Sequence, residues 1–173
     1  MKKSLYFEWS MLAFFLLAAS AYATDMRLLT CDGSQKIKVE VPSKISGQEF
    51  EIRCDSRHPD SISFIYTPPG SENGLVISIV KTKQMKTSFM VNIMAEQTIE
   101  DTVVNAKKTN IMELPRPNAV GKDSNNRLVS VFAADNSIVE IHDGRQDSSE
   151  EALVAFASGF AELVGPIISS WKE

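Results

Sequence analysis

The chain has 173 residues, of which 43% are hydrophobic and 23% are charged. This length fits about one domain of ~150 residues, and the apolar share is too high for a disordered chain. The 18 Lys and Arg are outnumbered by 22 Asp and Glu, which argues against nucleic acid as a partner because nucleic-acid binders carry a basic face. Two cysteines are too few for a disulfide scaffold or for a four-cysteine zinc site.

The first 23 residues have the pattern of a secretory signal peptide. Two lysines open the chain, a short apolar run occupies 11–19, and Ala21 and Ala23 form an A-x-A cleavage site. The apolar run is too short to cross a bilayer, which takes about 20 residues. We therefore predict cleavage of residues 1–23, one globular domain over 24–173 without a transmembrane segment, and export to the periplasm or, as second choice, to the medium.

Cys31 and Cys54 are the only cysteines of the chain. In an oxidising compartment two cysteines of this kind form one structural disulfide, which here closes a loop of about 24 residues. A redox-active or metal-binding pair is the weaker interpretation, because the chain has no C-x-x-C motif. We expect the bond to tie the N-terminal segment onto a hairpin formed by residues 35–41 and 48–54.

The first half of the chain carries the patterns of β-strands. Apolar and polar residues alternate in several runs, as in strands with one buried face. The run at 75–80 is continuously apolar, which predicts a strand covered on both faces, and Asn73-Gly74 before it is a hairpin signal. The expected strands are 35–41, 48–54, 61–67 and 75–80, and 89–94 is either a strand or an irregular edge.

The middle of the chain mixes a helix with further strands. Thr98 to Asp101 resembles a capping box with Asp in place of Glu, which predicts a helix from residue 98 to about 108. Its inward positions are expected to be Ile99, Val103 and Ala106. The segments that follow are predicted as a strand at 110–114, a long polar loop at 115–126, and two strands at 127–134 and 137–142 joined at Asp135-Asn136.

The C-terminal segment has the clearest helical pattern. Ser148 and Glu151 form a capping box, and apolar residues recur at three- and four-residue spacing from there onward. Pro166 clashes with the preceding turn, so a kink or break is expected near Gly165. The positions expected to face the core are Leu153, Phe156, Phe160, Leu163, Val164, Ile167 and Trp171.

This order of elements predicts an α+β fold, in which an antiparallel sheet carries a short helix and a long C-terminal amphipathic helix. The early strand that ends at Pro42, the helix from Thr98 and the final hairpin with its helix resemble the PsbP-like fold, which includes small periplasmic proteins resembling DcrB. The resemblance implies a non-enzymatic binding or accessory role as an assembly factor, chaperone or adaptor. It carries over no functional residue.

Residues able to do chemistry are sparse. His58 and His142 are the two histidines, and the chain has no G-x-S-x-G, no H-E-x-x-H and no glycine-rich phosphate loop. Four methionines suit Cu(I), although filling of the core is the better interpretation. We expect no cofactor and no metal, and keep a hydrolase as the third functional hypothesis. The methionines considered are Met85, Met90, Met94 and Met112.

The sequence is best interpreted as a non-catalytic periplasmic protein-binding module. It would be an immunity protein that blocks a toxin acting in the periplasm, or an accessory factor of the envelope or secretion machinery. The alternative is a small amphiphile or lipid held between the sheet and the C-terminal helix, against Phe156, Phe160 and Trp171. The partner surface is expected in loop 115–126 and segment 143–151, at Arg116, Asn118, Lys122, Asp123, Asp143, Arg145 and Asp147.

Overall fold

The computed structural model describes residues 25–33, 37–58, 60–81 and 86–171. The predicted signal peptide lies outside this part. The helices are α2 (Ser88–Thr102), α3 (Glu150–Ala161) and α4 (Val164–Ser170). The strands are β1 (Met26–Gly33), β2 (Ile37–Pro42), β3 (Lys44–Ile45), β4 (Gln48–Glu49), β5 (Glu51–His58), β6 (Ser61–Thr67), β7 (Leu75–Val80), β8 (Val104–Thr109), β9 (Asn118–Lys122), β10 (Leu128–Ala134) and β11 (Ser137–Asp143).

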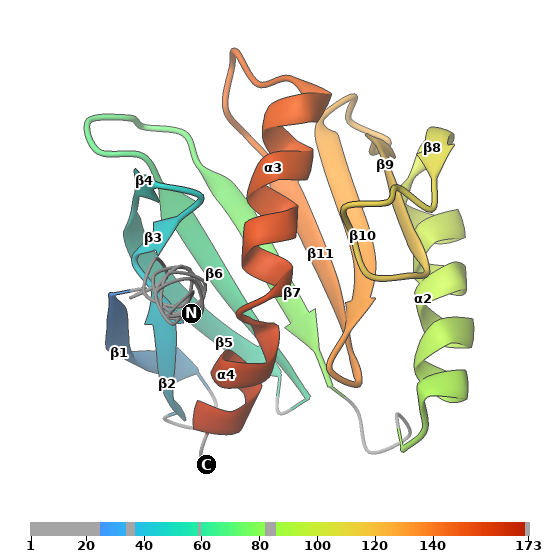
Figure 1. The fold of residues 1–173 in the computed structure, drawn as a ribbon. Helices are drawn as coiled ribbons and strands as arrows, with labels where there is room; N and C mark the ends of the chain where they lie inside the picture. Colours follow the sequence, from blue (N-terminus) through green and yellow to red (C-terminus); the bar gives the residue numbers. More distant parts are fainter. Residues whose placement is uncertain (1–24, 34–36, 59, 82–85, 172–173) are drawn as a thin grey trace, which may run out of the picture.

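The α+β fold class predicted from the sequence is confirmed. Nine of the described strands form one sheet in the order β2-β1-β5-β6-β7-β11-β10-β9-β8 (Figure 1). Its described neighbours are antiparallel, except that β1 and β5 run parallel. The small pair β3 and β4 stands beside the sheet, and α3 and α4 cross its front face in the view of Figure 1.

Strand β10 is buried on both faces, because α3 covers one face of the sheet and α2 the other. Phe132 belongs to the core beneath α3 and α4, whereas Val129 and Val131 belong to a second core beneath α2. Alternate side chains of a strand point to opposite faces, so a strand between two helices is apolar at almost every position. From α2, Val91 and Ala95 are the buried residues.

Aromatic rings fill the space between the sheet and α3. The Tyr66 ring of β6 lies 5.7 Å from Phe50, 5.9 Å from Phe156 and 5.9 Å from Phe160, measured between ring centroids. All of these contacts are edge-to-face, a geometry that aromatic pairs favour. Phe156 and Phe160 therefore belong to a filled core.

The predicted hairpin between residues 35–41 and 48–54 is wrong, because β1 lies between β2 and β5. Strand β1 has no clean alternation to signal it: Leu29 and Cys31 point inward, but apolar Leu28 is 64% exposed. The disulfide between Cys31 and Cys54 is confirmed. It joins β1 to β5 with a Cα–Cα distance of 5.1 Å.

The helix predicted over 98–108 begins at Ser88 and ends at Thr102, and the segment 89–94 is its first half rather than a strand. Thr87 is the N-cap, since its hydroxyl accepts the Met90 N–H at 3.3 Å. Thr98 lies inside the helix, where its hydroxyl donates to the Met94 carbonyl at 2.9 Å instead of capping. The residues after 103, which the sequence predicts as the end of the helix, instead form strand β8 at the edge of the sheet.

The predicted strand at 110–114 is a turn, and the predicted loop 115–126 contains β9. One buried side chain organises this turn. The Asn118 oxygen accepts the Ile111 N–H at 2.6 Å, and its amide donates to the carbonyls of Ile111, Leu114 and Pro115. A side chain that satisfies this many backbone groups stabilises a turn without a ladder of backbone hydrogen bonds.

Two hairpin connections were expected, and they differ in outcome. Asp135 and Asn136 have φ of 47° and 59°, as in the tight turn expected between the last two strands. The connection between β6 and β7 is wider than an Asn73-Gly74 turn. Its turn lies at Pro68–Ser71, with Gly70 at φ 75° and the Ser71 N–H donating to the Pro68 carbonyl at 3.0 Å.

The predicted C-terminal helix is divided into α3 and α4 by a 48° bend. Its N-cap is Ser149 rather than Ser148, and the break expected near Gly165 lies at 162–163. Pro166 thereby falls in the first turn of α4, where the backbone N–H that proline lacks would have no hydrogen-bond partner within the helix. No single described helix is long and apolar enough to cross a membrane, whereas α3 and α4 taken together meet that length and composition test.

Strand β7 is not covered on both faces as its sequence predicts. Ile65 and Val76 are paired on neighbouring strands, on the face opposite α3, and are 37% and 39% exposed. Helix α2 lies over β9, β10 and β11 and leaves this part of the sheet open. The face next to α2 is therefore solvent-accessible on β6 and β7.

Removing the disulfide should destabilise the fold measurably. Replacing Cys31 and Cys54 together by Ala is expected to lower the free energy of unfolding by about 3 kcal/mol, because the closed loop restricts the unfolded chain. Urea unfolding followed by circular dichroism measures the change. A reductant should lower the free energy of unfolding of the native protein toward that of the variant and leave that of the variant unchanged. Equal stability of the native protein and the variant without reductant contradicts the stabilising role of the disulfide.

Candidate functional site

The residues predicted at the partner surface differ in burial. Arg116, Lys122 and Asp147 are exposed. The side chains of Asn118, Asp123 and Asp143 are buried and bonded within the chain, and Arg145 is half-buried. Only the exposed three offer a partner a whole side chain, and the placement of the partner surface stays a prediction.

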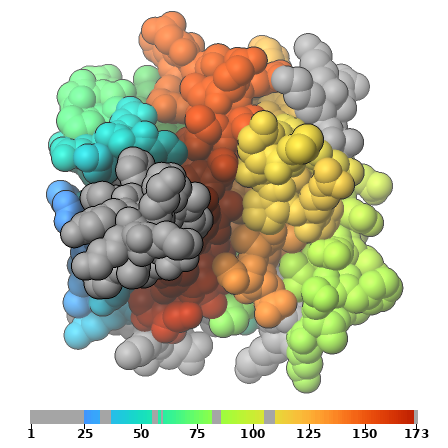
Figure 2. All heavy atoms as spheres, viewed as in Figure 1, coloured from blue at the N-terminus to red at the C-terminus, as the bar shows by residue number. Residues whose placement is uncertain are grey.

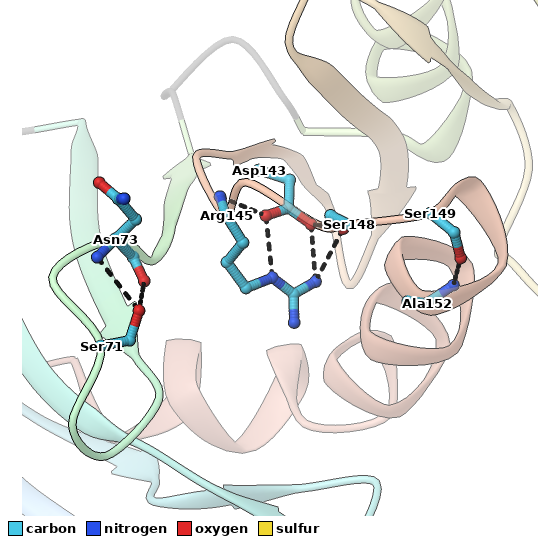
Figure 3. A network of polar contacts seen from close by, with 7 residues as sticks. All are labelled: Ser71, Asn73, Asp143, Arg145, Ser148, Ser149 and Ala152. Carbon is cyan, nitrogen blue, oxygen red and sulfur yellow. Dashed lines mark hydrogen bonds and ion pairs between the residues drawn. The ribbon is translucent and has the colours of Figure 1, made fainter.

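A buried carboxylate holds the connection between β11 and α3 (Figure 3). The Asp143 side chain accepts two hydrogen bonds from the Arg145 guanidinium, at 2.9 and 2.6 Å, and one from the Arg145 backbone N–H at 3.0 Å. The Ser148 hydroxyl also donates to Asp143. Burial by itself raises the pKa of Asp143, but the bonds from Arg145 and Ser148 outweigh it and leave the pKa below its usual value.

The backbone beside this network is tightly packed. The Gly144 N–H donates to the Gly74 carbonyl at 3.0 Å. A Cβ at Gly144 would lie 2.9 Å from the Gly74 carbonyl oxygen, so a side chain there would force the two loops apart. Asp143, Arg145 and Ser148 thus have a structural explanation, which is to fix the start of α3.

A second network surrounds His142 on the face that carries α2. Its Nδ1 lies 3.4 Å from Asp123 Oδ2, and its Nε2 lies 3.6 Å from Glu140 Oε2. Asp123 also pairs with Arg127 at 2.8 Å and accepts the N–H groups of Asn125 and Arg127. The Glu140 carboxylate raises the pKa of His142, and Asp123 adds to this, while partial burial opposes both.

This arrangement does not match a nucleophilic triad. A triad histidine is oriented by a carboxylate at one ring nitrogen and accepts the nucleophile's proton at the other. Around His142 both ring nitrogens face carboxylates. The other histidine, His58, is exposed and accepts the Asp60 N–H at 3.3 Å.

The outer face of α2 exposes apolar side chains. Phe89 is 68% exposed, Ile93 43% and Met90 38%. Phe89 and Ile93 are four residues apart, so they lie on the same side of the helix, away from buried Val91 and Ala95. A paired aromatic and β-branched residue on a solvent-facing helix surface is informative, since the fold does not need it there.

The same face continues with acidic residues. Glu96 and Glu100 follow Phe89 and Ile93 at helical spacing, and Asp101 lies beside them. All three are exposed, and none forms an ion pair within the described residues. Negative charge near the C-terminal end of a helix is unfavourable, and the last turn of α2 holds no basic residue to offset it.

The weak alternation of residues 89–94 predicts a strand or irregular edge and therefore hides this helical surface. The signal is present in the spacing of residues 89, 93, 96 and 100, which lie on one side of a helix. Of the methionines considered for copper, Met94 packs on the second core, Met90 and Met112 are exposed, and Met85 lies outside the described residues. Within those residues no group of three or more His, Cys, Asp or Glu is placed to hold a metal ion.

Comparison with protein families, with curated proteins and with solved structures finds no match to this chain. The resemblance to the PsbP-like fold therefore stays a prediction from the sequence.

Asp143 should contribute strongly to stability. Asp143→Asn leaves the Arg145 charge without its partner, so we expect a loss of about 3 kcal/mol in the free energy of unfolding, measured in urea. The pKa of Asp143 is lowered in the folded state, so its contribution is present above about pH 4 and is lost as the pH falls through the folded pKa. Asp147→Asn, at an exposed neighbour, should change the free energy of unfolding little. Similar losses of stability in both variants contradict the role of the network.

His142 should stabilise the protein mainly at mildly acidic pH. Its pKa is raised on folding, so its contribution is complete below about pH 6.5 and is lost as the pH rises through the folded pKa. We expect His142→Gln to lower the free energy of unfolding by up to about 1 kcal/mol at acidic pH relative to the native protein, and by less at alkaline pH. Unfolding curves across this range measure the difference. His58→Gln is the control, and a His142 effect that grows as the pH rises contradicts the sign.

Proposed function

We propose that the protein is a non-catalytic protein-binding module that docks its partner on the outer face of α2. The observation that carries this proposal is the exposed stripe of Phe89, Met90 and Ile93, which continues into Glu96 and Glu100. A helix that offers an apolar stripe to a groove is a recurrent mode of protein recognition. Aromatic side chains at the centre of such a surface contribute most of the binding free energy.

The charge on α2 indicates the chemistry of the partner. An apolar pocket on the partner would receive Phe89 and Ile93, and basic side chains beside it would pair with Glu96 and Glu100. Such pairing would offset the unfavourable carboxylates at the C-terminal end of the helix. Complementary charge also speeds association and selects against acidic partners.

The disulfide is consistent with the compartment proposed from the sequence. A disulfide between Cys31 and Cys54 persists in an oxidising environment such as the periplasm. In that compartment we propose two versions of the function: an immunity protein against a periplasm-acting toxin, or an accessory factor of the envelope or secretion machinery. An immunity protein has a secreted toxin as partner, and an accessory factor has an envelope component.

The proposal is tested by capture from envelope extract and culture supernatant on the purified, disulfide-intact protein, followed by affinity measurement with the captured partner. Phe89→Ser with Ile93→Ser should weaken binding at least about tenfold, since burial of an aromatic anchor is worth more than 1.4 kcal/mol. Glu96→Lys with Glu100→Lys should weaken binding more at low salt than at high salt, because salt screens charge–charge interactions.

Leu28→Ser with Met112→Ser is the matched control, because both residues are exposed and apolar but lie outside α2. This control should keep native affinity. A partner that binds the α2 variants as tightly as the native protein overturns the proposal. The proposal is also overturned if no captured protein binds the native protein and is lost from the α2 variants. Concentration-dependent dimerisation lost in the α2 variants would instead make a second copy the occupant, which also overturns it.

A further inference from the structure

A groove of about 690 Å³ runs along the outer face of α3. Ala155, Ser158 and Gly159 form its floor, Ile45 of β3 lines one side, and Ile111 lines the other. Figure 2 shows the recessed red surface of the helix between the cyan atoms of the β3 region and the yellow atoms of residues 110–117. The volume lies within the range of about 300–1,000 Å³ that is usual for small-molecule sites.

The groove is shaped by how α3 packs. The large side chains of α3, Leu153, Phe156 and Phe160, point into the core, so small residues remain on its outer face. The Ser46 hydroxyl donates to the Ala155 carbonyl at 3.0 Å and fixes the wall against the floor. A Cβ at Gly159 would lie 2.5 Å from the Ser46 hydroxyl oxygen, so a side chain there would displace this hydroxyl from its present position.

The rim of the groove is acidic. Glu113 and Glu162 are exposed on it and form no ion pair within the described residues. Glu150 and Glu151 also line it, and Lys44 is the single basic residue among its described lining residues. Apolar Val154 and Leu163 lie below this rim and are half-buried. The site therefore combines an apolar floor with negative potential at its opening.

We propose that this groove binds a single-chain amphiphile with a cationic head group. The alkyl chain lies along Ala155 and Gly159 between Ile45 and Ile111, and the cation meets the carboxylates of Glu113 and Glu162. The space between sheet and helix, where the sequence suggested an amphiphile, is occupied by Phe156 and Phe160. The groove lies across the sheet from α2, so this inference does not depend on the proposed function.

Three probes with the same alkyl chain and different heads test the proposal: dodecyltrimethylammonium, dodecyl sulfate and dodecyl maltoside, each below its micellar concentration. Isothermal titration calorimetry with the purified protein measures each affinity. We expect the cationic probe to bind at least about tenfold more tightly than the anionic one, with the neutral probe between them. Circular dichroism at each end point checks that the protein stays folded.

Two groove variants and one matched control locate the site. Glu113→Lys with Glu162→Lys should weaken the cationic probe about tenfold, and Ala155→Trp should abolish binding of all three probes by filling the groove. Glu51→Lys with Glu72→Lys makes the same change in net charge at two exposed residues that do not line the groove, and should leave the affinity within about twofold. Equal affinity for the three heads, no saturable binding, or cation binding that survives in both groove variants overturns the proposal.

Discussion

The aromatic cluster of Tyr66, Phe50, Phe156 and Phe160 is the contact on which the arrangement of this protein depends. It fixes α3 on the sheet by edge-to-face packing of large rings. The Tyr66 hydroxyl is buried in this cluster without a hydrogen-bond partner among the described residues, and burial raises its pKa. Because the large side chains of α3 point inward, its outer face is lined with small residues, which leaves the groove.

The helices on the two faces of the sheet bury different sets of its apolar side chains. Strands β10 and β11 carry apolar residues on both faces, so α3 alone does not cover them, and α2 must pack on the opposite face. Within α2 this contact uses buried Val91 and Ala95, with half-buried Met94 and Ile99 beside them. The outer face of α2 is therefore free of folding constraints, and its apolar and acidic residues call for an explanation outside the fold.

The sequence predicts the parts of the fold that depend on local patterns. The strands 61–67, 75–80, 127–134 and 137–142, the Asp135-Asn136 turn and the C-terminal helical pattern follow from alternation, turn residues and spacing. The sequence does not show the start of α2, because Thr87 caps the helix while Thr98 imitates a cap inside it. The sequence does not show the buried roles of Asn118 and Asp143 either, since a polar residue between strands gives no sign of the groups that it will contact.

Periodicity and a cysteine count of two are enough to predict the fold class and the Cys31–Cys54 pair, because they leave few alternatives. The position of β1 between β2 and β5, the helical state of residues 89–94 and the place of the groove outside α3 instead of beneath it are seen only in the folded chain. These outcomes depend on which faces meet. A local pattern shows that a segment has an apolar side, whereas the partner that buries this side is set by packing across the whole chain.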